Sequence, residues 1–179
     1  MKITNTENRY GMMAILLHWG IAILIIGLLA EGLYMVGLSV SLQKLKLFGW
    51  HKEYGMLVLI LACFRLGWRI TNTVPLLPKE IPTWQKLAAR TAHWAFYFFM
   101  FAMPITGWLI TSAAGLPVSF FGLVTFPDLV LPNADLRMEF IFIHKWLAYG
   151  LIATICVHTG AAFKHHFINK DNVLRGMLP

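Results

Sequence analysis

Charged side chains are scarce in this sequence of 179 residues. Lys, Arg, Asp and Glu make up 13% of it and hydrophobic residues 58%, whereas an average soluble domain is about 25% charged. The charges also leave long gaps, at residues 10–30, 91–127 and 146–163. These runs reach or approach the roughly 20 apolar residues that span a bilayer. The composition indicates an integral membrane protein and excludes collagen, coiled-coil, disulfide-knot and DNA-binding classes.

Cysteine is equally rare. Cys63 and Cys156 both lie in apolar runs, which favours small buried hydrophobic residues over a disulfide. A C-x-x-C-H motif is absent from the sequence, so covalent haem attachment of the c type is excluded. The polar start before the first apolar run resembles a signal peptide, but the uncharged stretch is too long for an h-region. We therefore expect a retained helix.

The apolar runs predict an all-α fold, a transmembrane four-helix bundle that forms a single integral membrane domain over residues 1–179. We expect helices at about 11–38, 50–70, 91–112 and 140–164. The second helix is the least obvious, because only 54–64 is wholly uncharged. It spans the bilayer if Arg65 and Arg69 reach toward one interface; a re-entrant segment is the alternative.

Basic residues predict the orientation. With the N-terminus inside, ten of the fifteen Lys and Arg residues are cytoplasmic, so the positive-inside rule favours an N-in/C-in topology in a bacterial inner membrane. The inner residues are Lys2, Arg9, Arg65, Arg69, Lys79, Lys86, Arg90, Lys164, Lys170 and Arg175, and the outer ones are Lys44, Lys46, Lys52, Arg137 and Lys145. We expect an extended inner loop at 71–90 and an outer loop at 113–139 that lies on the membrane interface.

Five of the seven histidines lie within or at the ends of the predicted helices, where ionisable groups are costly and face the bundle interior. His144 and His158 are 14 residues apart, which is roughly 21 Å along one helix and about 40° short of whole turns. They therefore share a face at opposite depths. His51 begins the second helix at the outer side and His18 lies early in the first at the inner side. The depths predict an outer pair, His51 with His144, and an inner pair, His18 with His158.

Two imidazoles on opposite sides of one point suit the axial positions of a haem iron. Zinc is the competing metal, but a tetrahedral site needs further ligands in each layer. His93 begins the third helix near the inner layer, where it is either a replacement ligand, a residue near a haem propionate, or an interfacial residue. His165 and His166 are expected in a solvated tail.

Haem propionates are anionic and require partners. Arg65 and Arg69, one helical turn apart, are candidates at the inner pair, and Lys52 and Lys145 at the outer pair; ordinary anchoring at the interface explains them equally well. Small residues near the histidines, Gly11 and Gly55, would let a flat macrocycle approach. Glu31 is either a proton-relay group or an interfacial residue.

The arrangement of these residues resembles the prokaryotic cytochrome b561 family over about residues 8–179. The likeness rests on the order and spacing of His18-Trp19, Trp50-His51 with Gly55, His93, the segment 103–107 (Met-Pro-Ile-Thr-Gly), His144, Val157-His158, His165-His166, and the late Lys170-Asp171-Asn172 and Arg175. The resemblance implies two non-covalent, bis-histidine haem b groups, with His18 and His158 on the inner haem and His51 and His144 on the outer. It further implies oxidoreductase activity in which superoxide is oxidised at the periplasmic face and ubiquinone is reduced.

The expected partners are membrane lipid, a quinone and a small anionic electron donor such as superoxide, attracted by the outer basic residues; no nucleic acid is expected. A first alternative is a haem-bearing subunit of a larger dehydrogenase or hydrogenase complex, with a membrane protein partner. A second is a small metal or proton transporter, and a third is a structural or assembly protein.

Overall fold

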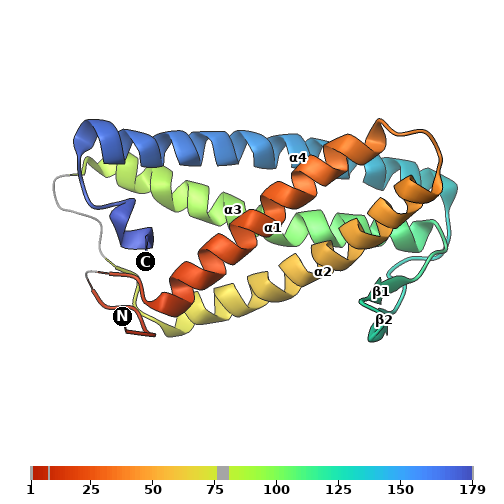
Figure 1. The fold of residues 1–179 in the computed structure, drawn as a ribbon, viewed down its shortest axis with the longest axis horizontal. Helices are drawn as coiled ribbons and strands as arrows, with labels where there is room; N and C mark the ends of the chain where they lie inside the picture. Colours follow the sequence, from red (N-terminus) through yellow and green to blue (C-terminus); the bar gives the residue numbers. More distant parts are fainter. Residues whose placement is uncertain (1, 8, 76–80, 179) are drawn as a thin grey trace.

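The computed structural model describes residues 2–7, 9–75 and 81–178. Within them, four helices are long and apolar enough to cross a membrane. They are α1 (Met12–Val36), α2 (Leu42–Thr71), α3 (Thr83–Ala113) and α4 (Ala134–Phe163), and a π-helical turn, η1 (Lys164–Asn169), continues α4. The helices form one elongated bundle in which α3 packs on α2 and α4, and α1 packs on α2 (Figure 1). The predicted all-α transmembrane four-helix bundle is confirmed.

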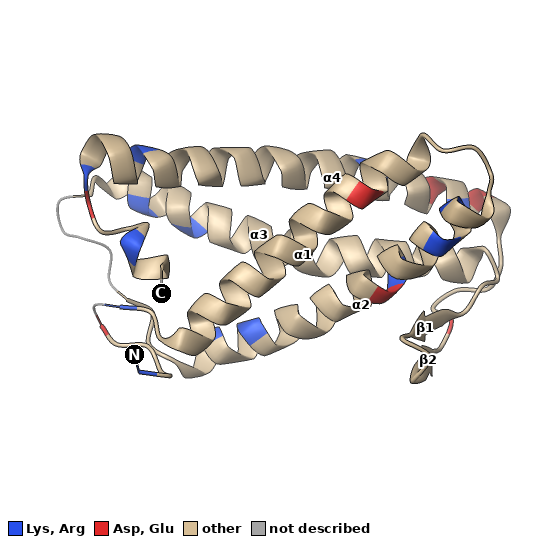
Figure 2. Cartoon of the chain, in the orientation of Figure 1, with Lys and Arg blue, Asp and Glu red and all other residues tan. Residues whose placement is uncertain are grey.

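Large apolar side chains cover the outside of the bundle as well as its inside. Leu16, Ile23, Phe64 and Val157 are exposed, as expected where acyl chains rather than water surround the helices. The buried core is small and consists of Ile21, Ile25, Val58, Ala62, Tyr97, Met100 and Leu151. Lys and Arg gather toward the two ends of the bundle (Figure 2), which leaves the intervening surface suited to a bilayer.

Three helices begin earlier than predicted. α2 begins at Leu42 rather than about 50, α3 at Thr83 rather than 91, and α4 at Ala134 rather than 140. The extra turns of α2 and α4 each begin at an N-cap. The Ser41 side chain accepts a hydrogen bond from the Lys44 N–H, and the Asn133 side chain accepts one from the Leu136 N–H. Such N-caps stabilise a helix start whether or not it is apolar, so boundaries taken from hydropathy were too short.

The inner loop is shorter than predicted, and the outer loop contains two strands that were not predicted. The inner loop was expected to be extended over 71–90, but α3 occupies its last part; Lys79, counted among the inner basic residues, lies outside the described residues. The outer loop contains an antiparallel hairpin of β1 (Val118–Phe120) and β2 (Val124–Phe126). The hairpin contacts α2 through the rings of Phe121 and Tyr54, whose centroids are 5.3 Å apart.

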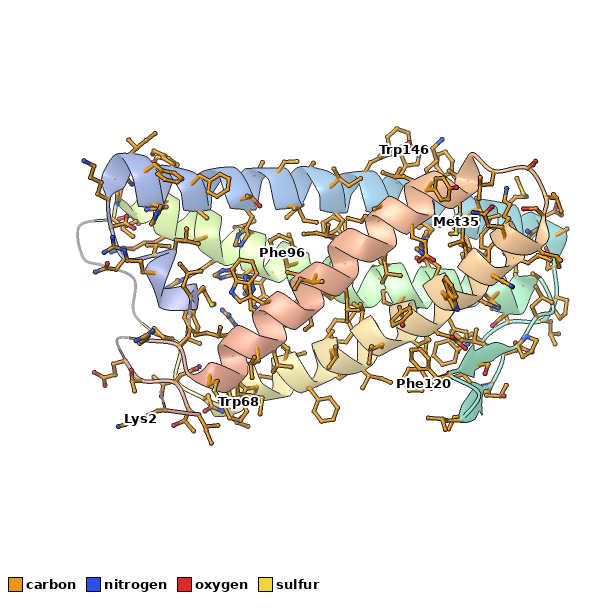
Figure 3. All side chains as sticks on the ribbon, in the orientation of Figure 1. Lys2, Met35, Trp68, Phe96, Phe120 and Trp146 are labelled. Atoms are coloured by element: carbon orange, nitrogen blue, oxygen red, sulfur yellow. The ribbon has the colours of Figure 1, made fainter. Side chains whose placement is uncertain are left out.

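Both described ends of the chain lie at the same end of the bundle. The Trp19 indole donates a hydrogen bond of 2.7 Å to the Met177 carbonyl, and the Arg9 guanidinium donates one of 3.4 Å to the Leu178 carbonyl. Figure 3 shows Lys2 and Trp68 toward this end and Met35, Phe120 and Trp146 toward the other. We refer to the end with the termini as the terminal end and to the other as the hairpin end.

Two expectations about single residues are wrong. Cys63 and Cys156 are free, as predicted, but they are exposed rather than buried, because the outer surface of the bundle is itself apolar. His165 is not a solvated tail residue. Its Nδ1 is paired with the Asp171 carboxylate in the turn that follows η1, and its side chain is only 14% exposed.

Candidate functional site

At the hairpin end, α2 and α4 bring His51 and His144 together. The two ring centroids are 6.3 Å apart and the ring planes are inclined by 71°. Both residues are partly buried in the bundle. These are the two histidines that their depth in the predicted helices had paired, and we call them the outer layer.

Glycines on the neighbouring helices lie against both rings of the outer layer. A Cβ on Gly32 of α1 would lie 3.3 Å from Cε1 of His51, and one on Gly107 of α3 would lie 3.6 Å from Cε1 of His144. In both cases Nδ1 is the next atom, at 4.0 Å. The glycines therefore support the Cε1–Nδ1 edge of each ring and leave its Nε2 for another partner.

Thr106 fixes the tautomer of His144. Its hydroxyl oxygen lies 2.8 Å from the Ala102 carbonyl, 2.9 Å from that of Met103 and 2.8 Å from Nδ1 of His144. A hydroxyl has one proton to donate, and the carbonyls can only accept it. When a carbonyl takes this proton, Nδ1 of His144 donates to Thr106, and the lone pair on Nε2 is free to bind a metal.

Nδ1 of His51 is a buried polar atom without a hydrogen-bond partner among the described residues. The nearest charged group is the Glu31 carboxylate of α1, whose Oε2 is 3.5 Å away. Both side chains are shielded, with exposed fractions of 21% for His51 and 19% for Glu31. Glu31 thus lies inside the bundle, beside one histidine of the outer layer.

At the terminal end, three histidines form the inner layer. The ring of His158 lies 6.3 Å from that of His18 and also 6.3 Å from that of His93, inclined by 63° in both cases. Phe96 packs edge-on against His158 at 5.1 Å, and Trp19 packs against His18 at 5.2 Å. At these distances, either His18 or His93 could bind one ion together with His158.

Arg65 lies directly beside the inner layer. Its Nη2 is 3.3 Å from Nδ1 of His18, and because a guanidinium can only donate, Nδ1 accepts and Nε2 carries the ring proton. Metal binding through Nε2 of His18 requires the other tautomer, so the guanidinium must then turn to a different acceptor. Arg69 stacks over the Tyr97 ring at 5.9 Å. Both arginines, taken as candidates for propionate binding, therefore face the bundle.

Tyr10 lies near the same two arginines, just before α1. Burial raises the pKa of the Tyr10 hydroxyl, and the positive charges of Arg69 and Arg65 offset part of that rise. The phenol therefore stays protonated at neutral pH and can donate a hydrogen bond at the terminal end.

The geometry of both layers fits an ion held between two imidazoles. Metal–imidazole bonds are about 2 Å long and the ring centre lies roughly 1 Å behind the nitrogen, so two opposed ligands have centroids about 6 Å apart. The measured separations are 6.3 Å. Among the described residues, no group of three or more His, Cys, Asp or Glu is placed to hold a metal ion, so a tetrahedral zinc site is not favoured.

The surroundings of the layers also leave room for a flat group. A Cβ on Gly55, one turn after His51, would meet nothing within 4 Å, although the residue is partly buried. Gly11 does not have this role, because a Cβ there would clash with the Ile3 carbonyl oxygen. The small residue expected near the inner layer instead lies against the N-terminal segment.

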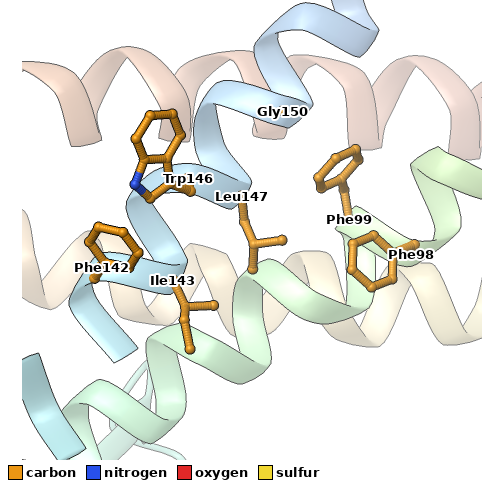
Figure 4. A pocket seen from close by; sticks show the side chains of 7 residues that line it. All are labelled: Phe98, Phe99, Phe142, Ile143, Trp146, Leu147 and Gly150. Atoms are coloured by element: carbon orange, nitrogen blue, oxygen red, sulfur yellow. The ribbon is translucent and has the colours of Figure 1, made fainter. Parts of the chain in front are cut away.

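An apolar groove of about 420 Å³ lies on the surface between α3 and α4 (Figure 4). Its lining carries no titratable side chain and consists of Phe98, Phe99, Phe142, Ile143, Trp146, Leu147 and Gly150. Such a surface suits acyl or isoprenoid chains and cannot supply acid–base chemistry.

Sequence reasoning missed Gly32, Thr106 and Gly107 as supports of the outer layer. Thr106 and Gly107 belong to the segment that carries the family resemblance, but no role followed from their spacing. Glu31 and Gly32 are adjacent in α1, and the pairing of an acidic residue with a small one inside an apolar run was the available signal.

Comparison with known proteins matches residues 9–179 to a family model described as prokaryotic cytochrome b561. Cytochrome b561 homolog 2 of Escherichia coli is 38% identical over 99% of this chain and 95% of its own length. Cytochrome b561 homolog 1 of the same organism is 31% identical over 96% and 98%. A protein of Yersinia pestis named probable superoxide oxidase CybB is 29% identical over 97% of each chain.

Proposed function

The chain belongs to the prokaryotic cytochrome b561 family of membrane electron-transfer proteins, and from this premise we propose that it carries electrons between the periplasmic face of a bacterial inner membrane and the quinone pool. The carriers are two non-covalent haem b groups. His51 and His144 hold the outer one, and His18 and His158 hold the inner one.

The observation that carries this proposal is the pair of histidine layers, each with two rings whose centroids are 6.3 Å apart. A haem held by two histidines would supply a one-electron couple suited to electron transfer rather than to binding oxygen. The protein side chains hold and orient the group: Thr106 and Gly107 fix His144, Gly32 supports His51, and Phe96 packs on His158.

Between the layers lies the buried core, which keeps water out of the path. Ile21 and Ile25 follow His18 on α1, while Val58 and Ala62 follow His51 on α2. The core therefore fills the middle of the bundle, and the two layers lie on either side of it. At the terminal end Arg65 and Arg69 would bind the propionates of the inner haem, and Lys52 and Lys145 would bind those of the outer.

The N-in/C-in topology follows from the excess of basic residues at the terminal end, which makes the hairpin end periplasmic. Thiol labelling of single cysteines tests this orientation. Two variants each carry one introduced cysteine, at residue 172 or at residue 123. In intact spheroplasts, a membrane-impermeant thiol reagent should react only with the cysteine at residue 123. Reaction at residue 172 alone would reverse the topology.

We assign superoxide as the donor and ubiquinone as the acceptor. The support is the relative named probable superoxide oxidase. The outer basic residues Lys44, Lys46, Lys52, Arg137 and Lys145 would attract a small anion, and Glu53, Asp128, Asp135 and Glu139 of the same end offset part of that attraction. Superoxide-dependent quinone reduction by the purified protein should fall steeply as ionic strength rises. A rate that does not depend on salt contradicts steering by these residues, and no quinone reduction at all contradicts the assigned activity.

A haem count tests the central proposal. Purified protein should contain two b haems per chain in a reduced-minus-oxidised spectrum with pyridine haemochrome quantification. Replacing His51 or His144 by Ala should remove one haem and leave the other. Loss of both haems from each single variant, or fewer than two in the unmodified protein, contradicts the assignment of two independent layers.

A further inference from the structure

Side chains of opposite charge lie beside Nδ1 of one histidine in each layer. In the outer layer the Glu31 carboxylate is 3.5 Å from Nδ1 of His51. In the inner layer the Arg65 guanidinium is 3.3 Å from Nδ1 of His18. Glu31 is on α1 and contacts a histidine of α2, whereas Arg65 is on α2 and contacts a histidine of α1.

The position of Glu31 is unusual for a residue that only anchors a helix. It lies five residues before the last residue of α1, its side chain is 19% exposed, and its neighbour Gly32 lies against the His51 ring. A Cβ at residue 32 would lie 3.3 Å from that ring, so glycine there lets the backbone of α1 approach His51 closely. This close approach brings the carboxylate to the one ring nitrogen that has no hydrogen-bond partner among the described residues.

The neighbouring basic residues are not paired with Nδ1 of His51, whose charged neighbour is Glu31. Lys52 and Lys145 each directly follow an outer histidine, and consecutive residues on a helix point about 100° apart. Lys145 is exposed. The carboxylate is thus the charged group that faces Nδ1 of His51.

A carboxylate that accepts from the Nδ1–H of a metal-bound imidazole makes the ligand more basic. A more basic axial ligand and a nearby negative charge both stabilise the oxidised iron and lower its reduction potential. A nearby guanidinium has the opposite effect, because it stabilises the state with one more electron. These effects are strong where water is excluded, as in a bundle within a bilayer.

We propose that Glu31 and Arg65 set the order of the two haem potentials, with the outer haem lower and the inner haem higher, so that electrons run downhill from the hairpin end to the terminal end. The inference rests on the proposed function, and Glu31 and Arg65 act in it as positioning residues. Glu31 completes the hydrogen bond to His51 in the loaded protein. Arg65 keeps its charge at the inner layer whether it contacts His18 or a propionate.

Spectroelectrochemical titration of the full-length protein with both haems bound tests this order. Glu31→Gln keeps an acceptor oxygen and removes the charge, so it should raise the outer potential. Arg65→Gln should lower the inner potential, and Arg65→Lys should preserve it. Each shift should change the equilibrium constant for electron transfer between the haems at least tenfold, which is about 59 mV for a one-electron couple.

The His51→Ala and His144→Ala variants, which retain only the inner haem, assign each potential to its layer. Matched charge controls are Glu139→Gln at the hairpin end and Arg90→Gln at the terminal end, because both side chains are exposed. Neither control should shift a potential by this amount. If Glu31→Gln fails to retain haem, Glu31→Asp, which keeps the charge but withdraws it from Nδ1, should give a smaller rise in the outer potential.

Unchanged potentials in Glu31→Gln and Arg65→Gln with two haems bound would overturn the inference and leave the proposed function standing. So would equal shifts in the controls, or an outer haem of higher potential than the inner one. Fewer than two haems in the unmodified protein would instead remove the proposed function, and this inference with it.

Discussion

The Thr106 hydroxyl on α3 lies 2.8 Å from Nδ1 of His144 on α4. When the hydroxyl proton is directed at the Ala102 or Met103 carbonyl of its own helix, the imidazole is the donor of this bond. The Thr106 side chain thus connects the α3 backbone to the imidazole of His144, which is a candidate ligand. Pro104, two residues earlier, lacks an N–H, so this turn of α3 already has an altered pattern of backbone hydrogen bonds.

Replacing Thr106 by Val removes the acceptor with little change of shape. The Nδ1–H of His144 is then unpaired in the bundle, which costs about 1–3 kcal/mol, and loss of such a partner typically weakens metal binding by about 10–100-fold. We expect the outer haem to dissociate faster by this factor, measured by haem transfer to excess apomyoglobin. Thr106→Ser should behave as the unmodified protein, and equal dissociation rates in the Val variant would contradict the role of the hydroxyl.

Gly32 and Gly107 offer a matched pair of substitutions. Alanine at residue 32 places a Cβ 3.3 Å from the His51 ring, tighter than an ordinary contact, whereas alanine at residue 107 leaves 3.6 Å to the His144 ring. Both changes favour the helix itself by about 0.5–1 kcal/mol. We expect Gly32→Ala to reduce the content of the outer haem and Gly107→Ala to retain it with unchanged or higher thermal stability. The same loss in both variants would show that the measured spacings do not govern the site.

The turn after η1 makes a pH-dependent contact. Burial by itself raises the pKa of the Asp171 carboxyl, but hydrogen bonds from His165, the Val173 N–H and Asn169 outweigh it, so the pKa lies below its ordinary value of about 4. A group with a lowered pKa contributes stability above its unfolded pKa and loses it as the pH falls through the folded one. The C-terminal segment should therefore loosen as the pH is lowered below about 4.

A nitroxide label at residue 172, in a background with Cys63 and Cys156 replaced by Ser, measures this loosening as mobility in EPR spectra. The unmodified turn should become mobile only in the acidic window. Asp171→Asn should be mobile at neutral pH and show no step in that window, and Asp135→Asn at the hairpin end should match the unmodified protein. A step of equal size in Asp171→Asn would assign the titration to another group.

The depth of each histidine in the bundle was predictable from sequence, whereas the rotation of each helix about its own axis was not. The rise per residue of a helix places His18, His51, His144 and His158 in two layers, and the structure brings these rings together. Their role as haem ligands stays a prediction. The contacts of Gly32, Thr106 and Gly107 depend on which face of each helix points inward. In a soluble protein, the polar stripe of a helix shows which face points outward. In a membrane protein, the lipid-facing side of a helix is as apolar as the side that faces the bundle.

The early starts of α2 and α4 could not come from hydropathy, because their first turns lie beyond the apolar runs. Ser41 and Asn133 were available as capping signals, since Ser and Asn are favoured N-caps. The hairpin depends on Phe121 and Gly122, which adopt positive φ values of 51° and 70°. Glycine there was an available turn signal, but the aromatic residues around it favoured an interfacial segment instead.

The inner layer offers two partners for His158 at the same ring separation of 6.3 Å, His18 and His93. The proposed function assigns the ligand to His18, which obliges Arg65 to release Nδ1 of that ring. His18→Ala and His158→Ala should therefore each lose the inner haem and keep the outer one, while His93→Ala should keep both, as counted by haemochrome and low-temperature spectra. Arg90→Gln provides the control, because this side chain is exposed at the terminal end and its replacement should leave both haems bound. Retention of two haems in His18→Ala together with loss of one in His93→Ala would move the inner ligand from α1 to α3, and the Arg65 guanidinium would then be free to stay on His18.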